Sequence, residues 1–189
     1  MQGQNRLFLK MFMKDNKGIG SITPSSKYLV REIITNINFD KAKVIVELGM
    51  GTGVITKELI KNCSINTKII GFETNQEMHD YVLNRLHSNI NPIFIKDNSI
   101  YLKYYLDKLN IKNVDYFICS LPLLNFNIKT RVNLLKNINS YMNKNSTFII
   151  CQYTNNTKFL LKEMFRVIRK KLILLNIPPA IIYVLKKNI

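Results

Sequence analysis

A glycine-rich turn carries the strongest chemical signal in this chain of 189 residues. The apolar run Val44–Leu48 holds an acid near its end, and three glycines at alternate positions follow it: these residues are Glu47, Gly49, Gly51 and Gly53. Glycine at such a turn lets the backbone approach a ligand and offer its N–H groups. The spacing lacks the third glycine of a dinucleotide site and the Gly-Lys-Ser/Thr of a phosphate loop. Because Glu47 would repel a pyrophosphate, we predict a ligand that carries an ammonium group.

Acidic and amide residues close the next two apolar runs. Glu73 lies 24 positions after Gly49, where a carboxylate can accept hydrogen bonds from both hydroxyls of a ribose. Asp97 and Asn98 end the third run, where they either accept from an adenine amino group or cap a helix. We therefore predict that Glu73, its neighbour Thr74, Asp97 and Asn98 bind a nucleoside. A purely structural Glu73 at a helix N-terminus is the alternative.

These residues must be positioned by alternating strands and helices. Short β-rich apolar runs predict strands at Val44–Leu48, Lys68–Phe72, Pro92–Ile95, Val114–Cys119, Thr147–Gln152, Phe165–Leu175 and Ile181–Leu185. Helical periodicity predicts helices at Thr52–Cys63, Gln76–His87, Ile100–Leu109 and Lys129–Met142, with another from Pro24 to about Ile37. The alternation implies parallel, right-handed crossovers, and the last two runs predict an antiparallel hairpin. We therefore expect an α/β fold, with a seven-stranded, mostly parallel sheet, an antiparallel C-terminal hairpin and helices on both faces.

The segment Ser120-Leu121-Pro122-Leu123 ends the fourth run. Many amino-group methyltransferases carry Asn/Asp-Pro-Pro-aromatic or Asn-Leu-Pro-aromatic there, where a carbonyl and a polar side chain hold the target nitrogen and the aromatic stacks on a base. Ser120 keeps a polar group, whereas Leu123 replaces the aromatic. Stacking is worth ~1–3 kcal/mol per base, so its loss tells against a nucleic-acid substrate. We predict that Ser120, Leu121 and Pro122 grip an amine, assisted by the Tyr153 hydroxyl.

Five segments in order resemble bacterial phospholipid N-methyltransferases over nearly the whole chain. They are Ile22-Thr-Pro-Ser-Ser26, Val46-Glu-Leu-Gly-Met-Gly-Thr-Gly-Val-Ile-Thr56, Ser120-Leu-Pro-Leu-Leu124, Gln152-Tyr153 and Asn176-Ile-Pro-Pro-Ala180. The resemblance implies a class I, Rossmann-like methyltransferase with S-adenosyl-L-methionine as cofactor. It implies methylation of phosphatidylethanolamine towards phosphatidylcholine, or of ornithine lipids.

We then expect distinct parts of the cofactor to meet distinct residues. Glu47 would hold the methionine part, Glu73 the ribose, and Asp97 with Asn98 the adenine, and we count Ser25 and Ser120 among the cofactor-binding residues as well. Methionine at position 50, where the family commonly has proline, is a minor departure.

The charge of the chain is strongly positive and unevenly distributed. There are 28 basic and 12 acidic residues, which gives a net charge of +16. AT-rich codon usage explains part of the lysine excess, but not the placement of twelve Lys and Arg against a single acid, Glu163, after residue 117. Such a field attracts nucleic acid or an anionic membrane. We expect an anionic membrane surface, rich in phosphatidylglycerol or cardiolipin, to be the partner.

The first twenty residues predict a separate amphipathic helix. Its apolar side holds Leu7, Phe8, Met11 and Phe12, and its basic side holds Arg6, Lys10, Lys14 and Lys17. This composition suits a helix in the plane of a membrane interface, or a lid over the cofactor. We divide the chain into a membrane-contacting helix over residues 1–20 and a methyltransferase domain over residues 21–189.

Other features of the sequence point to the compartment. No apolar run reaches the ~18 residues that cross a bilayer. Three cysteines without metal-ligand spacing predict reduced thiols and no metal site. We expect a cytoplasmic monomer that is peripheral on the inner face of the cell membrane.

Two other classes of protein remain open. An rRNA adenine dimethyltransferase shares this architecture and a basic surface, but the aromatic after Pro122 is missing and we expect no helical domain after the hairpin. A non-enzymatic basic binding module would have no reason to keep Glu47, Glu73 and Asp97 at strand ends.

Overall fold

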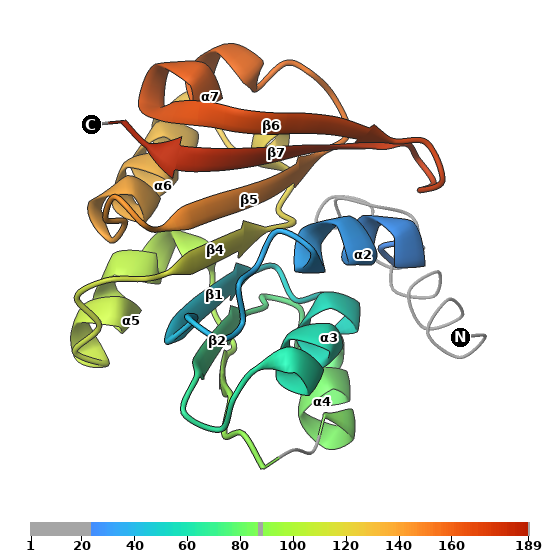
Figure 1. Ribbon diagram of the computed structural model, residues 1–189, viewed down its shortest axis with the longest axis vertical. Helices are drawn as coiled ribbons and strands as arrows, with labels where there is room; N and C mark the ends of the chain where they lie inside the picture. The colour runs from blue at the N-terminus through green and yellow to red at the C-terminus, as the bar shows by residue number, and fades with distance from the viewer. Residues whose placement is uncertain (1–23, 87–88, 189) are drawn as a thin grey trace.

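The computed structural model describes residues 24–86 and 89–188. Its centre is a seven-stranded sheet with strand order β3-β2-β1-β4-β5-β7-β6 (Figure 1). The strands are β1 (Val44–Leu48), β2 (Lys68–Phe72), β3 (Ile93–Ile95), β4 (Tyr116–Cys119), β5 (Thr147–Gln152), β6 (Phe165–Ile173) and β7 (Ala180–Lys187). Neighbouring strands among β1 to β5 pair in parallel, whereas β7 is antiparallel to both β5 and β6. The predicted fold class is confirmed.

Helices cover both faces of this sheet (Figure 1). They are α2 (Lys27–Ile34), α3 (Val54–Asn62), α4 (Gln76–Arg85), α5 (Leu102–Lys108), α6 (Ile128–Ser140) and α7 (Lys158–Met164), with short 3-10 turns η1 (Ser99–Tyr101) and η2 (Leu123–Asn125). One hydrophobic cluster joins the sheet to α5, α6 and α7, and a second joins it to α2 and α3. Strands buried on both faces explain the continuous apolar runs in the sequence.

Polar caps set where several helices begin. The Ser26 Oγ atom accepts a hydrogen bond from the Leu29 N–H at 3.3 Å. Asn75 caps α4 and Asn127 caps α6 in the same way. Such side chains satisfy N–H groups that the first helical turn leaves free. No helix within residues 24–86 and 89–188 is long and apolar enough to cross a membrane.

Most elements differ from the expected bounds by one to three residues at an end, and one helix was not expected. Helix α7 was not predicted, because its pattern runs directly into β6 at Phe165 with no polar break. Strand β6 ends at Ile173, so Leu174 and Leu175 belong to a turn. Helix α2 ends at Ile34 because the side chains of Thr35 and Asn36 bond the Glu32 carbonyl. The predicted helix over residues 1–20 lies outside the described residues.

Gly71 in β2 supplies room for a neighbouring side chain. A Cβ atom at this position would lie 2.2 Å from the Met50 sulfur, and Met50 itself is buried. We expect Gly71→Ala to lower the free energy of unfolding by about 1–3 kcal/mol, as overpacked cores do. In a double-mutant cycle measured by denaturant unfolding, Met50→Ala should recover part of that loss. Strictly additive effects would contradict the packing described.

Candidate active site

The glycine turn lies where β1 ends, at the edge of the sheet that also holds the carboxyl ends of β4 and β5 (Figure 1). Gly49, Gly51 and Gly53 have φ angles of +85°, +54° and +74°, which L side chains rarely adopt. The N–H groups of Gly49 and Met50 both donate to the Phe72 carbonyl at 3.0 Å. These bonds hold the turn against the end of β2.

Two of these glycines differ in their surroundings. A Cβ atom on Gly49 would lie 2.8 Å from the Leu121 Cδ2 atom, whereas one on Gly51 would meet nothing within 4 Å. The turn therefore packs against the Ser120 segment at Gly49 and faces open space at Gly51. That space is where a ligand can approach the backbone.

Glu47 is fully buried beneath the turn. Its Oε2 atom accepts a hydrogen bond from the Thr56 hydroxyl at 2.7 Å, and its Oε1 atom is buried without a partner in the described structure. Burial raises the pKa of Glu47 from 4.5 to about 8, with a smaller upward contribution from Glu73 and an opposing one from the Thr56 bond. A buried carboxylate oxygen without a partner is costly, and an ammonium group supplies both the donor and the positive charge.

Glu73 lies directly beside the glycine turn. Its Oε2 atom accepts from the Gly51 N–H at 2.8 Å, and its Oε1 atom accepts from the Asn75 N–H at 2.9 Å. These bonds fix the carboxylate at the end of β2, and each oxygen has a further lone pair for a hydroxyl donor. The bond to Gly51 links two candidate residues that the sequence could associate only by spacing.

Asp97 and Asn98 lie at the end of β3. The Asp97 Oδ2 atom accepts from the Tyr105 hydroxyl at 2.7 Å, and Oδ1 accepts from the Asn98 N–H at 2.6 Å. The Asn98 Oδ1 atom accepts from the Ile100 N–H and caps the short turn η1. Asn98 thus has a structural role, and Tyr105, which sequence reasoning missed, orients Asp97.

The Ser120 segment follows β4 on the other side of the turn. The Ser120 Oγ atom is buried without a hydrogen-bond partner in the described structure. The Leu121 carbonyl accepts from the Gln152 Nε2 atom at 2.9 Å and keeps a second lone pair. Leu123 is fully buried in the hydrophobic core. In the sequence, Gln152 is marked only by its place in the Gln152-Tyr153 segment, which assigns it no role.

The remaining candidate residues lie around this edge with less defined contacts. Pro122 precedes η2, and Tyr153 follows the end of β5 and packs against the cluster that contains α2. Ser25 is half-buried beside the capping residue Ser26, whereas Thr74 is exposed after Glu73. Their predicted roles stay predictions.

The fold and these strand-end acids define a class I S-adenosyl-L-methionine-dependent methyltransferase. Residues 14–174 match the family model for ribosomal RNA adenine dimethylase, and the chain belongs to this family.

Three known proteins illustrate what the chain is similar to. It is 28% identical over 142 residues to an ornithine lipid N-methyltransferase of Singulisphaera acidiphila, covering 75% of this chain and 74% of that protein. It is also 28% identical over 184 residues to ribosomal RNA small subunit methyltransferase A of Mycoplasma capricolum, covering 84% of this chain and 67% of that protein. The structure of TrmK from M. capricolum with S-adenosyl-homocysteine shares the fold at a TM-score of 0.62 and 18% identity, over 84% of this chain and 67% of that one.

The cofactor of this class is S-adenosyl-L-methionine, whose sulfonium supplies an electrophilic methyl group. The residues present fit it. The unpartnered Glu47 Oε1 atom suits the ammonium of its methionine part, Glu73 has capacity for ribose hydroxyls, and Gly51 leaves the backbone open.

Tyr105 offers a test of how Asp97 is held. We expect Tyr105→Phe to weaken binding of S-adenosylhomocysteine by roughly 3- to 10-fold, because one hydrogen bond is worth about 0.5–1.5 kcal/mol. The matched control is Tyr104→Phe, since Tyr104 is the exposed neighbour on the same helix. Calorimetric titration measures both variants. Equal affinities of the two variants would show that the Tyr105 hydroxyl does not position Asp97 for the cofactor.

Proposed function

We propose that the chain methylates the amine of a lipid headgroup, using S-adenosyl-L-methionine at an anionic membrane surface. Phosphatidylethanolamine, towards phosphatidylcholine, is the substrate we favour, and an ornithine lipid is the close variant. The relative named for ornithine lipid methylation, which aligns with 75% of this chain, supports the proposal.

The observation that carries the proposal is the burial of the Leu123 side chain. Many enzymes that methylate a base stack it on an aromatic ring at the fourth position of this segment, directly after the proline, and stacking holds the base against the methyl donor. Leu123 takes that place in the sequence, and its side chain is fully buried among core residues. A small aliphatic amine needs polar contacts and no stacking surface.

Polar atoms around this segment can hold such an amine. The buried Ser120 hydroxyl has no partner in the described structure, and the Leu121 carbonyl keeps a second lone pair beside its bond to Gln152. Tyr153 completes the proposed grip. An ammonium of pKa near 10 needs about 4 kcal/mol to lose its proton at pH 7. We assign catalysis to alignment and desolvation of the neutral amine by these groups.

The proposal extends to the location of the protein. We propose residues 1–20 as a membrane-contacting helix and residues 21–189 as the catalytic domain. The net charge of +16 supports attraction to phosphatidylglycerol or cardiolipin. We place the enzyme in the cytoplasm, as a monomer at the inner face of the cell membrane.

Adenine dimethylation in ribosomal RNA is the second candidate. The family model and the M. capricolum relative support it, and a basic surface suits RNA as well as lipid. The buried Leu123 favours the lipid.

A methyl-transfer assay with each acceptor offered alone tests the proposal. The acceptors are vesicles with phosphatidylethanolamine, vesicles with an ornithine lipid, and a ribosomal RNA fragment. We expect methylated lipid in at least one vesicle sample and none on RNA, with mass spectrometry counting the methyl groups per lipid. Methylation of the RNA alone would overturn the proposal.

A further inference from the structure

The turn that joins β6 to β7 presents aliphatic side chains to the outside. Leu174, Leu175 and Ile177 are 69%, 62% and 77% exposed. Three large aliphatic groups so close together are unusual on a protein surface that meets only water, and such patches mark interaction sites.

The turn is held in place by one buried side chain. Asn176 is 1% exposed. Its Oδ1 atom accepts from the Ser26 N–H at 2.9 Å, and its Nδ2 atom donates to the Pro178 carbonyl at 2.7 Å. Asn176 thereby ties the turn to the start of α2. The leucines before it and the isoleucine after it stay largely exposed on this anchored turn.

The turn projects from the edge that carries the active site. Strand β7 is antiparallel to β5, and Gln152 at the end of β5 pairs with Ile181 near the start of β7. The residues between β6 and β7 therefore extend beyond the carboxyl end of β5, near the start of α2 and on the same side of the sheet as the strand ends that position Ser120 and the glycine turn (Figure 1). A surface that contacts the turn would face the catalytic groups.

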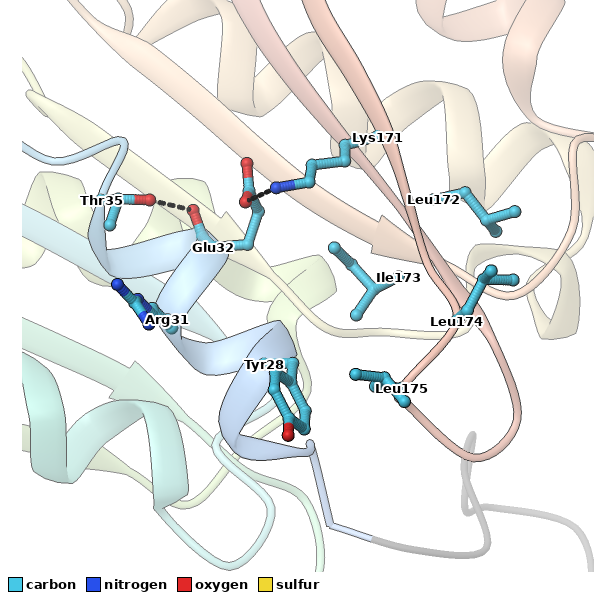
Figure 2. Close-up of a pocket in the computed structure, with 9 residues that line it drawn as sticks. All are labelled: Tyr28, Arg31, Glu32, Thr35, Lys171, Leu172, Ile173, Leu174 and Leu175. Atoms are coloured by element: carbon cyan, nitrogen blue, oxygen red, sulfur yellow. Dashed lines mark hydrogen bonds and ion pairs between the residues drawn. The ribbon is translucent and has the colours of Figure 1, made fainter.

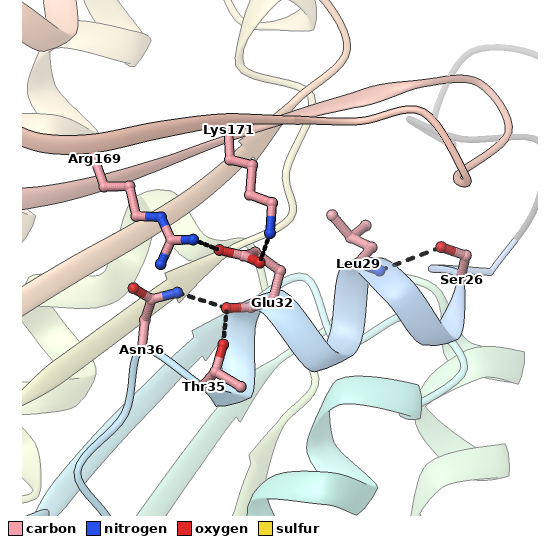
Figure 3. A network of polar contacts seen from close by, with 7 residues as sticks. All are labelled: Ser26, Leu29, Glu32, Thr35, Asn36, Arg169 and Lys171. Carbon is pink, nitrogen blue, oxygen red and sulfur yellow. Dashed lines mark hydrogen bonds and ion pairs between the residues drawn. The ribbon is translucent and has the colours of Figure 1, made fainter.

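Basic residues of β6 lie between the exposed turn and the rest of the protein. Arg169 and Lys171 of β6 both pair with the buried Glu32 carboxylate of α2, at 3.0 and 2.5 Å (Figure 3). Two cations on one carboxylate leave this junction net positive. Beside it is a pocket of about 560 Å³ between α2 and the turn, where Tyr28 and Leu175 face each other and Arg31 adds another cation (Figure 2).

We propose that the β6–β7 turn is a membrane-contacting element that inserts its aliphatic side chains below the headgroups of an anionic bilayer. The inference rests on the proposed lipid substrate and deepens it, because it names the surface that brings the active-site edge to the lipid. The aliphatic side chains of the turn match the apolar layer of a bilayer, and the cations next to the turn match the anionic headgroups above that layer. RNA fits less well, because the exposed side chains of the turn include no aromatic ring for stacking.

The chain contains no tryptophan, so one introduced residue reports its own environment. In the full-length protein, the Leu175→Trp variant should emit at shorter wavelength when phosphatidylglycerol vesicles are added, and brominated lipid should quench it. The control is Ile65→Trp, an exposed position before β2 at the opposite edge of the sheet, which should respond to neither. If the emission is already blue-shifted without vesicles and does not change when vesicles are added, another part of the chain covers the turn. Quenching by RNA but not by lipid would equally overturn the proposal.

Vesicle flotation gives the second measurement. Leu174→Ser/Ile177→Ser should lower binding to phosphatidylglycerol vesicles by about tenfold or more, because two aliphatic side chains no longer move from water into the lipid. The matched control is Ile65→Ser/Leu83→Ser, which removes two exposed aliphatic groups elsewhere and should bind as wild type. Thermal unfolding checks that both variants fold. Equal flotation of the two variants would contradict insertion of the turn.

These measurements separate the inference from the proposed function. Emission and flotation need neither cofactor nor methyl transfer, so they report insertion alone. Methylation of detergent-dispersed lipid needs no bilayer, so it reports the substrate alone.

Discussion

Replacing Glu47 by Gln is expected to weaken binding of S-adenosylhomocysteine by roughly 10- to 100-fold at about pH 8. Glu47 is fully buried, and its Oε1 atom has no hydrogen-bond partner in the described structure. A hydrogen bond that involves a charged group is worth about 1.5–3 kcal/mol, and Gln keeps the shape while removing the charge. Calorimetric titration measures the loss.

The effect should depend on pH in a defined direction. Burial holds the pKa of Glu47 near 8, so the carboxyl is mostly neutral at about pH 6 in the free protein. Only the ionised form pairs with an ammonium group. Affinity of the wild type should therefore rise with pH by roughly tenfold per unit below pH 8, whereas Glu47→Gln should show a nearly flat profile. Equal affinities of the two proteins at pH 8 would remove Glu47 from the site.

Stability without cofactor provides the control. The pKa of Glu47 in the folded protein lies above its ordinary value of 4.5, so the folded state binds the proton more tightly than the unfolded state. This contribution to stability is present at low pH and falls as pH rises from about 5 to 8. Glu47→Gln has no ionised form to bury. It should be at least as stable as wild type at pH 8, and a large loss of stability would point to misfolding instead.

Gly51→Ala is the second change with a large expected effect, and it should separate binding from folding. A Cβ atom at Gly51 meets nothing within 4 Å, so the cost to folding is the left-handed backbone alone, about 1–2 kcal/mol. The same atom projects into the open space through which we expect the cofactor to meet the turn. We expect roughly 10- to 100-fold weaker binding of S-adenosylhomocysteine, which corresponds to about 1.4 kcal/mol per factor of ten.

Two comparison variants sharpen this test. Asn110 has a φ of +55°, close to the +54° of Gly51, and lies between α5 and β4 at the opposite edge of the sheet. Asn110→Ala should lose comparable stability and keep its affinity. Gly49→Ala should lose both, because its Cβ atom would lie 2.8 Å from Leu121. Unchanged affinity in Gly51→Ala would show that the cofactor does not use this turn.

Much of the fold follows from local sequence. Strands β1, β2 and β5 have the predicted bounds, because runs buried on both faces of a parallel sheet stay mostly apolar and stop where polar or glycine residues begin. Helix α7 was missed because its apolar residues merge with those of β6. Leu174 and Leu175 extended the predicted strand for the same reason: an exposed aliphatic turn has the composition of a strand.

The sequence predicts which residues of the candidate site lie at strand ends. It does not predict the hydrogen bonds between them. Glu47, Glu73 and Asp97 follow from their positions at or just after the ends of apolar runs. The bond from Gly51 to Glu73, the Tyr105 hydroxyl on Asp97 and the Gln152 amide on Leu121 join segments 8 to 31 residues apart. Such pairings depend on how the helices pack and leave no local pattern.

The central claim, that the methyl acceptor is a lipid amine, is tested most directly by competition in one tube. The full-length protein receives S-adenosyl-L-methionine with a labelled methyl group, together with anionic vesicles that contain phosphatidylethanolamine and an ornithine lipid, and with ribosomal RNA in equal acceptor amounts. Solvent extraction then separates lipid from RNA. We predict that the label enters the organic phase as methylated headgroup. Label found in the RNA as methylated adenine, with none in the lipid, would contradict the account.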